Sequence, residues 1–465
     1  MTQTNRFPDT ILILLSILIL FIVLTWLLPA GEFSKVEKNG ITVVVPGSYQ
    51  EVEPAPQGLG AFLTAPIKGF IKAAQIIAFV FLIGGAFSIV TRTGAITAGL
   101  ESILDFSKRH PAYKNWILPV VMLIFSVGGA TFGMSEENLV FILITIPLAL
   151  SLGYDSLVGV SIPFVGAGAG FAGAVLNPFT IGVAQGIAEL PLFSGWEYRL
   201  VVWAVITAIA IWFVMAYARR IEKNPEKSPV YELDKTRLFD KEAASRTDLT
   251  FRRKLILWLL ALTLVALIGG VIQYEWYINE IAGLFLALGL LSALVYRMPV
   301  DESVSAFKDG ARDMMTAGLV IALSKAVLIV AQDGKIIDTM LNSVTGLVGD
   351  FHPFVSANVM FAVQYVIHFL VPSGSGQAAL TIPIMAPLGD LLGITRQTTV
   401  LIFQFGDGLN SMILPTSGVT MGILSIAKIP FNVWLKWIAP LMIWFYLAAI
   451  LLLVPPIFFF FYGPF

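Results

Sequence analysis

The chain contains no cysteine, only three histidines and few charged residues. The absence of cysteine excludes disulfide bridges, thiolate metal sites and cysteine nucleophiles, and no histidine–carboxylate spacing resembles a metal site. Charged residues are 13% and hydrophobic residues 57% of the 465 residues, whereas about a quarter of the residues of a soluble domain are charged. The chain is therefore an integral membrane protein. The net charge of −1 gives no indication of a nucleic-acid partner, and we expect no cofactor.

Nine apolar runs are long enough for spanning helices, each of which needs about 20 apolar residues. The first run lacks a small-residue cleavage site, so we expect a retained helix rather than a signal peptide. The runs cover residues 11–29, 73–92, 157–190, 197–218, 255–273, 277–296, 314–331, 397–427 and 433–454, and the third and eighth are interrupted.

Two further regions are apolar at both ends and polar in the middle. Residues 116–151 are interrupted by GMSEEN, and residues 354–392 by VPSGSGQ. The arms beyond each break have about 13–15 residues, too few to cross a bilayer. We predict two re-entrant hairpins, because non-helical backbone at membrane depth is tolerated only inside protein or beside a water-filled cavity. The predicted fold class is thus an all-α integral membrane protein with about nine transmembrane helices and two hairpins.

The basic residues indicate the orientation of these helices. When the N-terminus is placed in the cytoplasm, most of the 29 lysines and arginines fall in cytoplasmic segments, as the positive-inside rule requires. We therefore expect a multi-pass protein of the bacterial cytoplasmic (inner) membrane, embedded in the lipid bilayer, with a cytoplasmic N-terminus. The polar stretch 221–254 is too short to build a core of its own and is predicted to be a cytoplasmic linker.

The two halves of the chain resemble each other weakly. Residues of the same type recur at one constant spacing: Gly94 and Gly334, Ser135 and Ser375, Pro147 and Pro387, and Gly153 and Gly393. The number of spans before each half predicts that the halves are inverted in the membrane. The predicted sections are 1–56 (first helix and outer loop), 57–220 (first repeat, with hairpin 116–151 and broken helix 157–190), 221–254 (linker), 255–300 (two linking helices) and 301–455 (second repeat, with hairpin 354–392 and broken helix 397–427).

Inverted repeats with paired broken helices indicate a transporter whose site lies near the membrane midplane. The two hairpin tips would enter from opposite faces and meet the two broken helices there. Helix N-termini attract carboxylates, and freed carbonyls can coordinate Na⁺. Polar residues at the tips and breaks are candidate substrate ligands, or they only satisfy freed backbone groups: Ser135, Asn138, Asn177, Thr180, Ser373, Ser375, Gln377, Asn410, Thr416 and Ser417.

An ionisable residue at membrane depth is costly and is therefore first considered as a functional residue. This adds Glu136, Glu137 and Asp407 to the candidate substrate site. Alternatively, a glutamate faces water or pairs with Lys325, and Asp407 caps the broken helix. Lys325 lies inside a predicted span and is a charge partner, a gate, an anion ligand or part of a structural ion pair. For His368, in the second hairpin, a satisfied polar contact is favoured over a proton relay.

The stretches GMSEEN, NPFTIGVAQ, VPSGSGQAALTIPIMAPLGD and GDGLNSMILPTSG resemble those of the YfcC and C4-dicarboxylate anaerobic carrier (DcuC-like) family. That family includes basic amino acid (arginine/ornithine) antiporters and belongs to the ion transporter superfamily. The resemblance covers about residues 57–450 and implies an elevator-type carrier, in which two hairpins and two broken helices slide against a dimerised scaffold. We therefore expect a homodimer and a small-molecule substrate.

The substrate and the coupling ion follow from charge. Glu136, Glu137 and Asp407 face one nearby base, Lys325, which favours a basic amino acid of the arginine/ornithine type over a C4-dicarboxylate. The Ser-Glu-Glu-Asn tip also departs from the Ser-Asn-Thr pattern of the divalent anion carriers in the superfamily. Coupling to Na⁺, coupling to H⁺ and pure exchange stay open; a Na⁺ site would lie near Ser135, Asn138, Asn177, Ser375 and Thr416.

A channel is the main alternative of another class, but inverted repeats with paired hairpins fit alternating access better. An enzyme is not expected, because no catalytic or nucleotide-binding motif is present.

Overall fold

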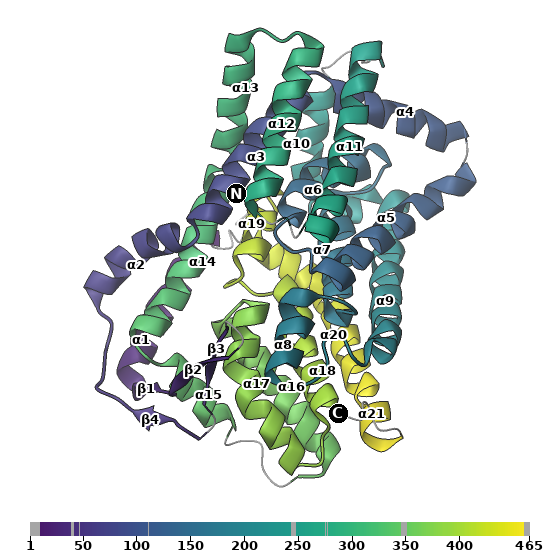
Figure 1. Ribbon diagram of the computed structural model, residues 1–465. Coiled ribbons are helices and arrows are strands. Elements are labelled where there is room, and N and C mark those ends of the chain that lie inside the picture. Colours follow the sequence, from purple (N-terminus) through teal and green to yellow (C-terminus); the bar gives the residue numbers. More distant parts are fainter. Residues whose placement is uncertain are drawn as a thin grey trace, which may run out of the picture.

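The computed structural model describes residues 10–38, 41–45, 47–109, 111–242, 248–274, 276, 278–345 and 351–459. The described chain is mostly helical, as predicted (Figure 1). Seven of its helical stretches are long and apolar enough to cross a membrane, by length and composition: Ala74–Arg92, Ser156–Gly173, Trp196–Lys223, Ile278–Tyr296, Val300–Asp333, Pro353–Leu370 and Phe431–Phe458. A multi-pass membrane protein is therefore confirmed, whereas the count of nine spans stays a prediction.

The N-terminal part forms a helix and two short antiparallel strand pairs. They are α1 (Thr10–Leu27), β1 (Gly31–Glu32), β2 (Lys35–Lys38), β3 (Ile41–Val44) and β4 (Gln50–Glu51), with β1 paired to β4 and β2 to β3. The strands lie beside α15 (Ile337–Thr345) and α17 (Gly374–Leu391) in Figure 1, and β3 packs against α17. This outer ribbon therefore touches the second predicted hairpin.

The first half then runs through α2 (Leu59–Lys72), α3 (Ala74–Arg92), α4 (Ala95–Arg109), α5 (Pro111–Phe132), α6 (Asn138–Ser151), α7 (Ser156–Gly173), η1 (Pro178–Gly182), α8 (Val183–Ile187) and α9 (Trp196–Lys223). The breaks expected in the hairpin and in the broken helix lie between α5 and α6 and between α7 and η1, a short π-helix. The first hairpin arm, α5, has 22 residues, because the helix extends toward its N-terminus beyond the apolar run.

The second half repeats this order of elements. A linking section, η2 (Pro225–Lys227), α10 (Tyr231–Glu242), α11 (Phe251–Tyr274) and α12 (Ile278–Tyr296), precedes it. It contains α13 (Val300–Asp313), α14 (Met315–Asp333), α15 (Ile337–Thr345), α16 (Pro353–Leu370), α17 (Gly374–Leu391), α18 (Arg396–Gly408), η3 (Asn410–Met412), α19 (Gly418–Ile426), α20 (Phe431–Leu452) and α21 (Val454–Phe458). Helix α16 has 18 residues and is among the stretches long enough to cross, so length alone does not distinguish this hairpin arm from a span.

Helices α2 and α3 pack antiparallel against α13 and α14. Along this seam residue numbers rise on one side and fall on the other: Lys68 pairs with Asp333, Gly69 contacts Ala326, Gly84 contacts Gly310, and Arg92 pairs with Asp309. Small residues let the backbones approach closely: a Cβ on Gly84 would lie 2.8 Å from the carbonyl oxygen of Gly310. Along this seam α2–α3 and α13–α14 thus run in opposite directions.

The predicted linker contains a helix, α10, that holds both broken helices at one end. Asp234 Oδ2 accepts a hydrogen bond from Ser156 N, at the start of α7, at 2.7 Å. Arg237 pairs with Asp234 at 3.6 Å and donates to the carbonyl oxygen of Ala427, at the end of α19. Burial raises the pKa of Asp234 and lowers that of Arg237. The linker helix is therefore part of the packed structure.

We expect Asp234→Ala to lower the free energy of unfolding by about 1–3 kcal/mol, because it leaves the N-terminal amide of α7 without its acceptor and removes the carboxylate that pairs with Arg237. Glu232→Ala, at an exposed position on the same helix, should change it by less than about 0.5 kcal/mol. Thermal unfolding of the purified variants in detergent measures both. Equal shifts for the two variants would show that α10 does not hold α7.

Candidate functional site

The first tip, residues 133–137, is a turn closed by its own side chains. Gly133 adopts a positive φ of 69°, which ends α5 in the manner of a glycine cap. Glu137 Oε2 accepts from Ser135 N at 3.0 Å, and Asn138 Nδ2 donates to the carbonyl oxygen of Ser135 at 3.0 Å. Two predicted ligands, Glu137 and Asn138, therefore also shape the tip.

The second tip lies directly on the first half of the chain. Ser373 caps α17, and its Oγ accepts from Gly376 N at 3.4 Å. A Cβ on Gly374 would lie 2.5 Å from Thr180 Cγ2 and 3.0 Å from Asp407 Oδ2. Glycine is therefore needed for the tip to pack against both broken helices.

Polar caps also start the segments that follow the two breaks. Asn177 Oδ1 accepts from Phe179 N at 2.9 Å and from Thr180 N at 3.3 Å, while Ser417 Oγ accepts from Thr420 N at the start of α19 at 3.3 Å. These contacts fix the breaks in the chain and leave the N-terminus of α19 directed at the space between the tips.

The tips and breaks meet in one cavity of about 290 Å³. Its predicted lining residues are Ser135, Glu136, Glu137, Thr180, Lys325, Ser373, Ser375, Asp407 and Ser417. Five other predicted residues, Asn138, Asn177, Gln377, Asn410 and Thr416, do not line it. The cavity therefore brings residues from both halves together.

The five remaining residues bind mainly to neighbouring protein groups. Asn410 donates to the Gly406 carbonyl oxygen at 2.5 Å and accepts from Tyr446 Oη at 2.7 Å. Thr416 Oγ1 donates to the Phe369 carbonyl oxygen at 2.9 Å. These contacts match the alternative that such residues satisfy local backbone and side-chain groups. For Na⁺, the described residues contain no group of three or more His, Asp or Glu side chains that could hold a metal ion.

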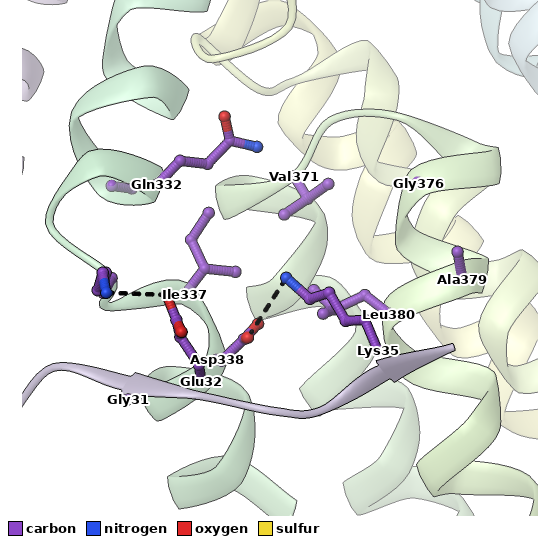
Figure 2. A pocket seen from close by; sticks show the side chains of 12 residues that line it. Gly31, Glu32, Lys35, Gln332, Ile337, Asp338, Val371, Gly376, Ala379 and Leu380 are labelled. Carbon is purple, nitrogen blue, oxygen red and sulfur yellow. Dashed lines mark ion pairs between the residues drawn. The ribbon is translucent and has the colours of Figure 1, made fainter. Parts of the chain in front are cut away.

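A larger cavity of about 460 Å³ lies between the N-terminal strands and the helices α14, α15 and α17 (Figure 2). Its charged side chains pair with each other: Glu32 with Lys335 at 3.1 Å and Lys35 with Asp338 at 3.7 Å. Because these charges already have partners, we take the smaller central cavity as the functional site.

Some residues that line the central cavity were not predicted to belong to the site. Ser411 and Thr420 add polar groups to its wall, as does His368, for which only a polar contact was expected. The apolar part of the wall includes the aromatic rings of Phe164, Phe171, Phe179 and Trp276. Ser411 could have been found, because it lies four residues after Asp407 in a helical stretch and hence on the same face. Phe164 and Phe171 lie seven residues apart on α7, so helical spacing could have placed them on one face. Phe179 and Trp276 come from other parts of the chain, and no spacing connects them to this pair.

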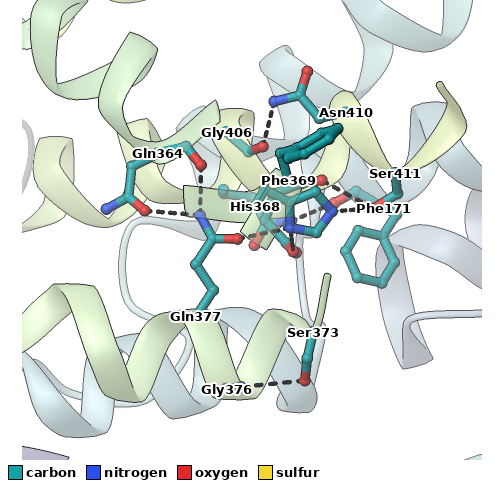
Figure 3. Close-up of polar contacts among 12 residues, drawn as sticks. Phe171, Gln364, His368, Phe369, Ser373, Gly376, Gln377, Gly406, Asn410 and Ser411 are labelled. Carbon is teal, nitrogen blue, oxygen red and sulfur yellow. Dashed lines mark hydrogen bonds and ion pairs between the residues drawn. The ribbon is translucent and has the colours of Figure 1, made fainter. Parts of the chain in front are cut away.

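His368 and Asp407 form the central polar contact of this cavity. Figure 3 shows the His368 ring between Gln377 and Ser411. His368 Nδ1 lies 3.0 Å from Asp407 Oδ1 and 2.7 Å from Gln377 Oε1, and Nε2 lies 3.0 Å from Ser411 Oγ. The side chains of His368 and Asp407 are only 3% and 1% exposed. The polar contact expected for His368 is therefore present, and it includes a carboxylate.

The second oxygen of Asp407 has no hydrogen-bond donor within the described chain. Within the described chain, neither Asp407 Oδ2 nor Thr180 Oγ1 has a hydrogen-bond partner, although both are buried. An unpartnered buried carboxylate oxygen is energetically costly unless a ligand donates to it. The cavity thus combines an anionic acceptor, aromatic rings that can face a cation, and the N-termini of α17 and α19, which favour a carboxylate.

The other charged residues of the cavity are arranged differently. Glu136 and Lys325 line it together, near enough for their charges to attract each other. Glu137 is engaged with the turn at Ser135. Of the three acids predicted at the site, Asp407 is therefore the one with a buried oxygen that lacks a donor.

Comparisons with known proteins give matches that extend along nearly the whole chain. The model of the C4-dicarboxylate anaerobic carrier family matches residues 7–456. An Escherichia coli (strain K12) protein named "Putative basic amino acid antiporter YfcC" is 38% identical over 476 residues, covering 94% of this chain and 93% of that protein. An uncharacterized protein of Haemophilus influenzae (strain ATCC 51907 / DSM 11121 / KW20 / Rd) is 28% identical over 487 residues, covering 95% of each chain.

Solved membrane transporters align with the structure at low similarity. The Alcanivorax borkumensis YdaH transporter gives a TM-score of 0.43 at 14% identity, covering 98% of this chain and 100% of that one. Neisseria gonorrhoeae MtrF, from a class of antimetabolite efflux pumps, gives 0.41 at 16% identity, covering 98% and 96%.

Proposed function

Because this chain belongs to the C4-dicarboxylate anaerobic carrier family, as its tips and breaks indicated, we propose that it is a secondary transporter of a basic amino acid of the arginine/ornithine type. The family consists of membrane transporters, which points away from an enzyme. The name of the Escherichia coli relative agrees with a basic amino acid substrate and with antiport.

One observation carries the choice of substrate: the unpartnered Asp407 Oδ2 shares a cavity with two helix N-termini. An ammonium or guanidinium group of the substrate donates to Asp407 and Thr180, with aromatic rings beside it. The substrate carboxylate is placed near Ser373, Ser375 and Ser417, where backbone amides begin α17 and α19. The remaining lining residues, including Lys325, set the charge around the substrate carboxylate. A cavity of about 290 Å³ is large enough for one small metabolite.

A C4-dicarboxylate is the second candidate, and the family description favours it. Two carboxylates would then share the cavity with Glu136, Glu137 and Asp407, so Na⁺ or H⁺ would have to neutralise these acids first. The proposed Na⁺ ligands, at Ser135, Asn138, Asn177, Ser375 and Thr416, belong to this coupled alternative.

For the architecture we propose two inverted repeats, 57–220 and 301–455, in an elevator-type homodimer of the bacterial inner membrane with a cytoplasmic N-terminus. The hairpins 116–151 and 354–392 and the broken helices 157–190 and 397–427 form the moving body. The antiparallel seam between α2–α3 and α13–α14 supports the inversion. The central cavity, lined from both halves, supports a site between them.

The inverted arrangement predicts that single cysteines at Ser151 and Leu391 label from opposite faces of the membrane. These residues end α6 and α17, the second arms of the two hairpins, and Leu391 is 86% exposed. The chain has no native cysteine, so an impermeant maleimide applied to oriented vesicles reports each site alone. Labelling of both positions from one face would rule out inverted repeats.

The function is tested by thermal-shift and counterflow assays of the purified protein in proteoliposomes. Arginine, ornithine and lysine should stabilise the protein and exchange across the membrane, and succinate and fumarate should not. Response to the dicarboxylates alone would replace the basic amino acid with the second candidate. Uptake that depends on internal substrate, without a Na⁺ or pH gradient, would identify an exchanger, whereas single-channel currents would identify a channel.

A further inference from the structure

His368 lies on α16, one turn before the second tip, with its ring buried between α17 and α18. Both ring nitrogens have hydrogen-bond partners. Whether each partner donates or accepts indicates which ring nitrogens carry a hydrogen. In a neutral imidazole one nitrogen donates and the other accepts, whereas in the imidazolium both nitrogens donate.

The partners of Nδ1 accept hydrogen bonds. Gln377 Nε2 donates to the backbone carbonyl oxygen of Gln364 at 2.9 Å and to Gln364 Oε1 at 2.8 Å. A backbone carbonyl can only accept, so the amide of Gln377 is oriented with Oε1 toward the histidine at 2.7 Å. Asp407 Oδ1, at 3.0 Å, is also an acceptor. Nδ1 therefore carries a hydrogen.

The partner of Nε2 is also arranged as an acceptor. Ser411 has one hydroxyl hydrogen, and its Oγ donates this hydrogen to the carbonyl oxygen of Asp407 at 3.0 Å. Its oxygen is then free to accept from Nε2 at 3.0 Å. When Ser411 donates to this carbonyl oxygen, both ring nitrogens of His368 donate, as they do in an imidazolium, and Nδ1 does so toward Asp407.

Other charged groups around this pair are few in the described structure. Glu136, Glu137 and Lys325 line the same cavity. On the elements packed against α16, Asp338 of α15 pairs with Lys35, and Asp390 of α17 pairs with Arg396 of α18. The hydroxyl of Tyr446 on α20 is bonded to Asn410, and Tyr365 of α16 lies against the Tyr446 ring. Asp407 is thus the carboxylate that directly contacts His368.

We propose that, in the absence of substrate, His368 carries both ring protons as the counter-ion of Asp407, and that a cationic group binding to Asp407 Oδ2 releases one of them. This inference rests on the proposed function for the identity of the cation. It assigns two roles to one carboxylate, because Oδ1 contacts His368, whereas Oδ2 lies next to Gly374 of the second tip and has no hydrogen-bond donor.

The exchange conserves charge within the site. The arriving ammonium or guanidinium group adds one positive charge next to Asp407, and the two cations would repel each other across one carboxylate. The N–H bond at Nε2 breaks and the proton passes to water in the cavity, while the electron pair stays on Nε2. The Ser411 hydroxyl then turns from the Asp407 carbonyl oxygen to donate to Nε2. One substrate cation thus replaces one proton.

The test reads the protonation of His368 directly by nitrogen NMR. The chain has three histidines, so replacing His110 and His352 with glutamine leaves His368 as the single labelled ring. In the ligand-free protein at about pH 7 we expect the imidazolium signature, with both nitrogens protonated. Asp407→Asn, which removes the counter-charge, should give a neutral ring at the same pH. A neutral ring in the ligand-free parent protein would overturn the proposal without any substrate being added.

Saturating arginine should convert the parent spectrum to that of a neutral ring. Calorimetry in buffers of different ionisation enthalpy should then show release of about one proton per arginine bound. An unchanged imidazolium with bound arginine would overturn the exchange. If no basic amino acid binds, the proposed function fails, while the ligand-free spectrum still decides whether His368 is the counter-ion. Thermal unfolding of each variant confirms that it is folded.

Discussion

Asp407→Asn is expected to weaken arginine binding by about 100-fold and to change the binding of citrulline, its neutral analogue, by less than about threefold. At an effective dielectric near 20, a charge pair about 4 Å apart gains roughly 4 kcal/mol before desolvation is subtracted. A loss of about 2.7 kcal/mol is consistent with that figure after desolvation. Asparagine keeps the size of the side chain, so calorimetry of the two ligands isolates the charge.

Two matched variants define how specific this effect is. Asp309→Asn removes one negative charge from an exposed ion pair with Arg92 and should leave arginine binding unchanged. Glu137→Gln should weaken arginine binding less than Asp407→Asn, because the amide oxygen of glutamine can still accept from Ser135 N. Equal losses for arginine and citrulline in Asp407→Asn would contradict a charge role. Tighter succinate binding in that variant would support the dicarboxylate alternative.

A disulfide between α14 and α19 is expected to abolish exchange, because the elevator proposal requires the broken helix to slide past α14. A Cβ on Gly418 would lie 3.5 Å from Ile321 Cγ2 and 3.9 Å from Ile321 Cα, a distance suitable for a disulfide. Oxidised Gly418→Cys/Ile321→Cys should therefore lose counterflow, and reduction should restore it.

Two controls separate blocked movement from a blocked cavity, which both residues line. Each single-cysteine variant should transport under oxidising conditions. The pair Gly389→Cys/Thr399→Cys joins α17 to α18 inside the proposed moving body, where a Cβ on Gly389 would lie 2.5 Å from Thr399 Oγ1. This second cross-link should leave exchange intact. Full exchange in the oxidised α14–α19 variant would end the elevator model.

The breaks in the helices could be predicted from the sequence because each has a local cause. Gly133 supplies a positive φ, Pro372 cannot continue α16, and Ser373 and Ser417 cap the helices that follow. These effects operate over a few residues, so the sequence could predict where these helices end and begin. The re-entrant hairpins and broken helices to which the breaks were assigned stay predictions.

The sequence could not predict in the same way which polar residues face the cavity and which bond to neighbouring helices. Asn410 and Asp407 lie three residues apart, yet Asn410 binds Tyr446 on α20 while Asp407 faces the cavity. That difference depends on which distant helix covers each face. The same applies to the docking of α10 through Asp234 and Arg237, because nothing within the linker specifies Ser156 or Ala427 as partners.

The seam between α3 and α13 limits which changes can compensate for one another. At Gly84 and Gly310 the contact is backbone against backbone: a Cβ on Gly84 would lie 2.8 Å from the Gly310 carbonyl oxygen, and a Cβ on Gly310 would meet the Gly84 carbonyl oxygen. A Cβ on Gly85 would instead meet the Phe307 ring at 2.5 Å. In genetic terms, a smaller residue at 307 can suppress a Gly85→Ala defect, but no substitution can shorten a carbonyl group. The facing glycine therefore offers no intragenic suppressor at that crossing.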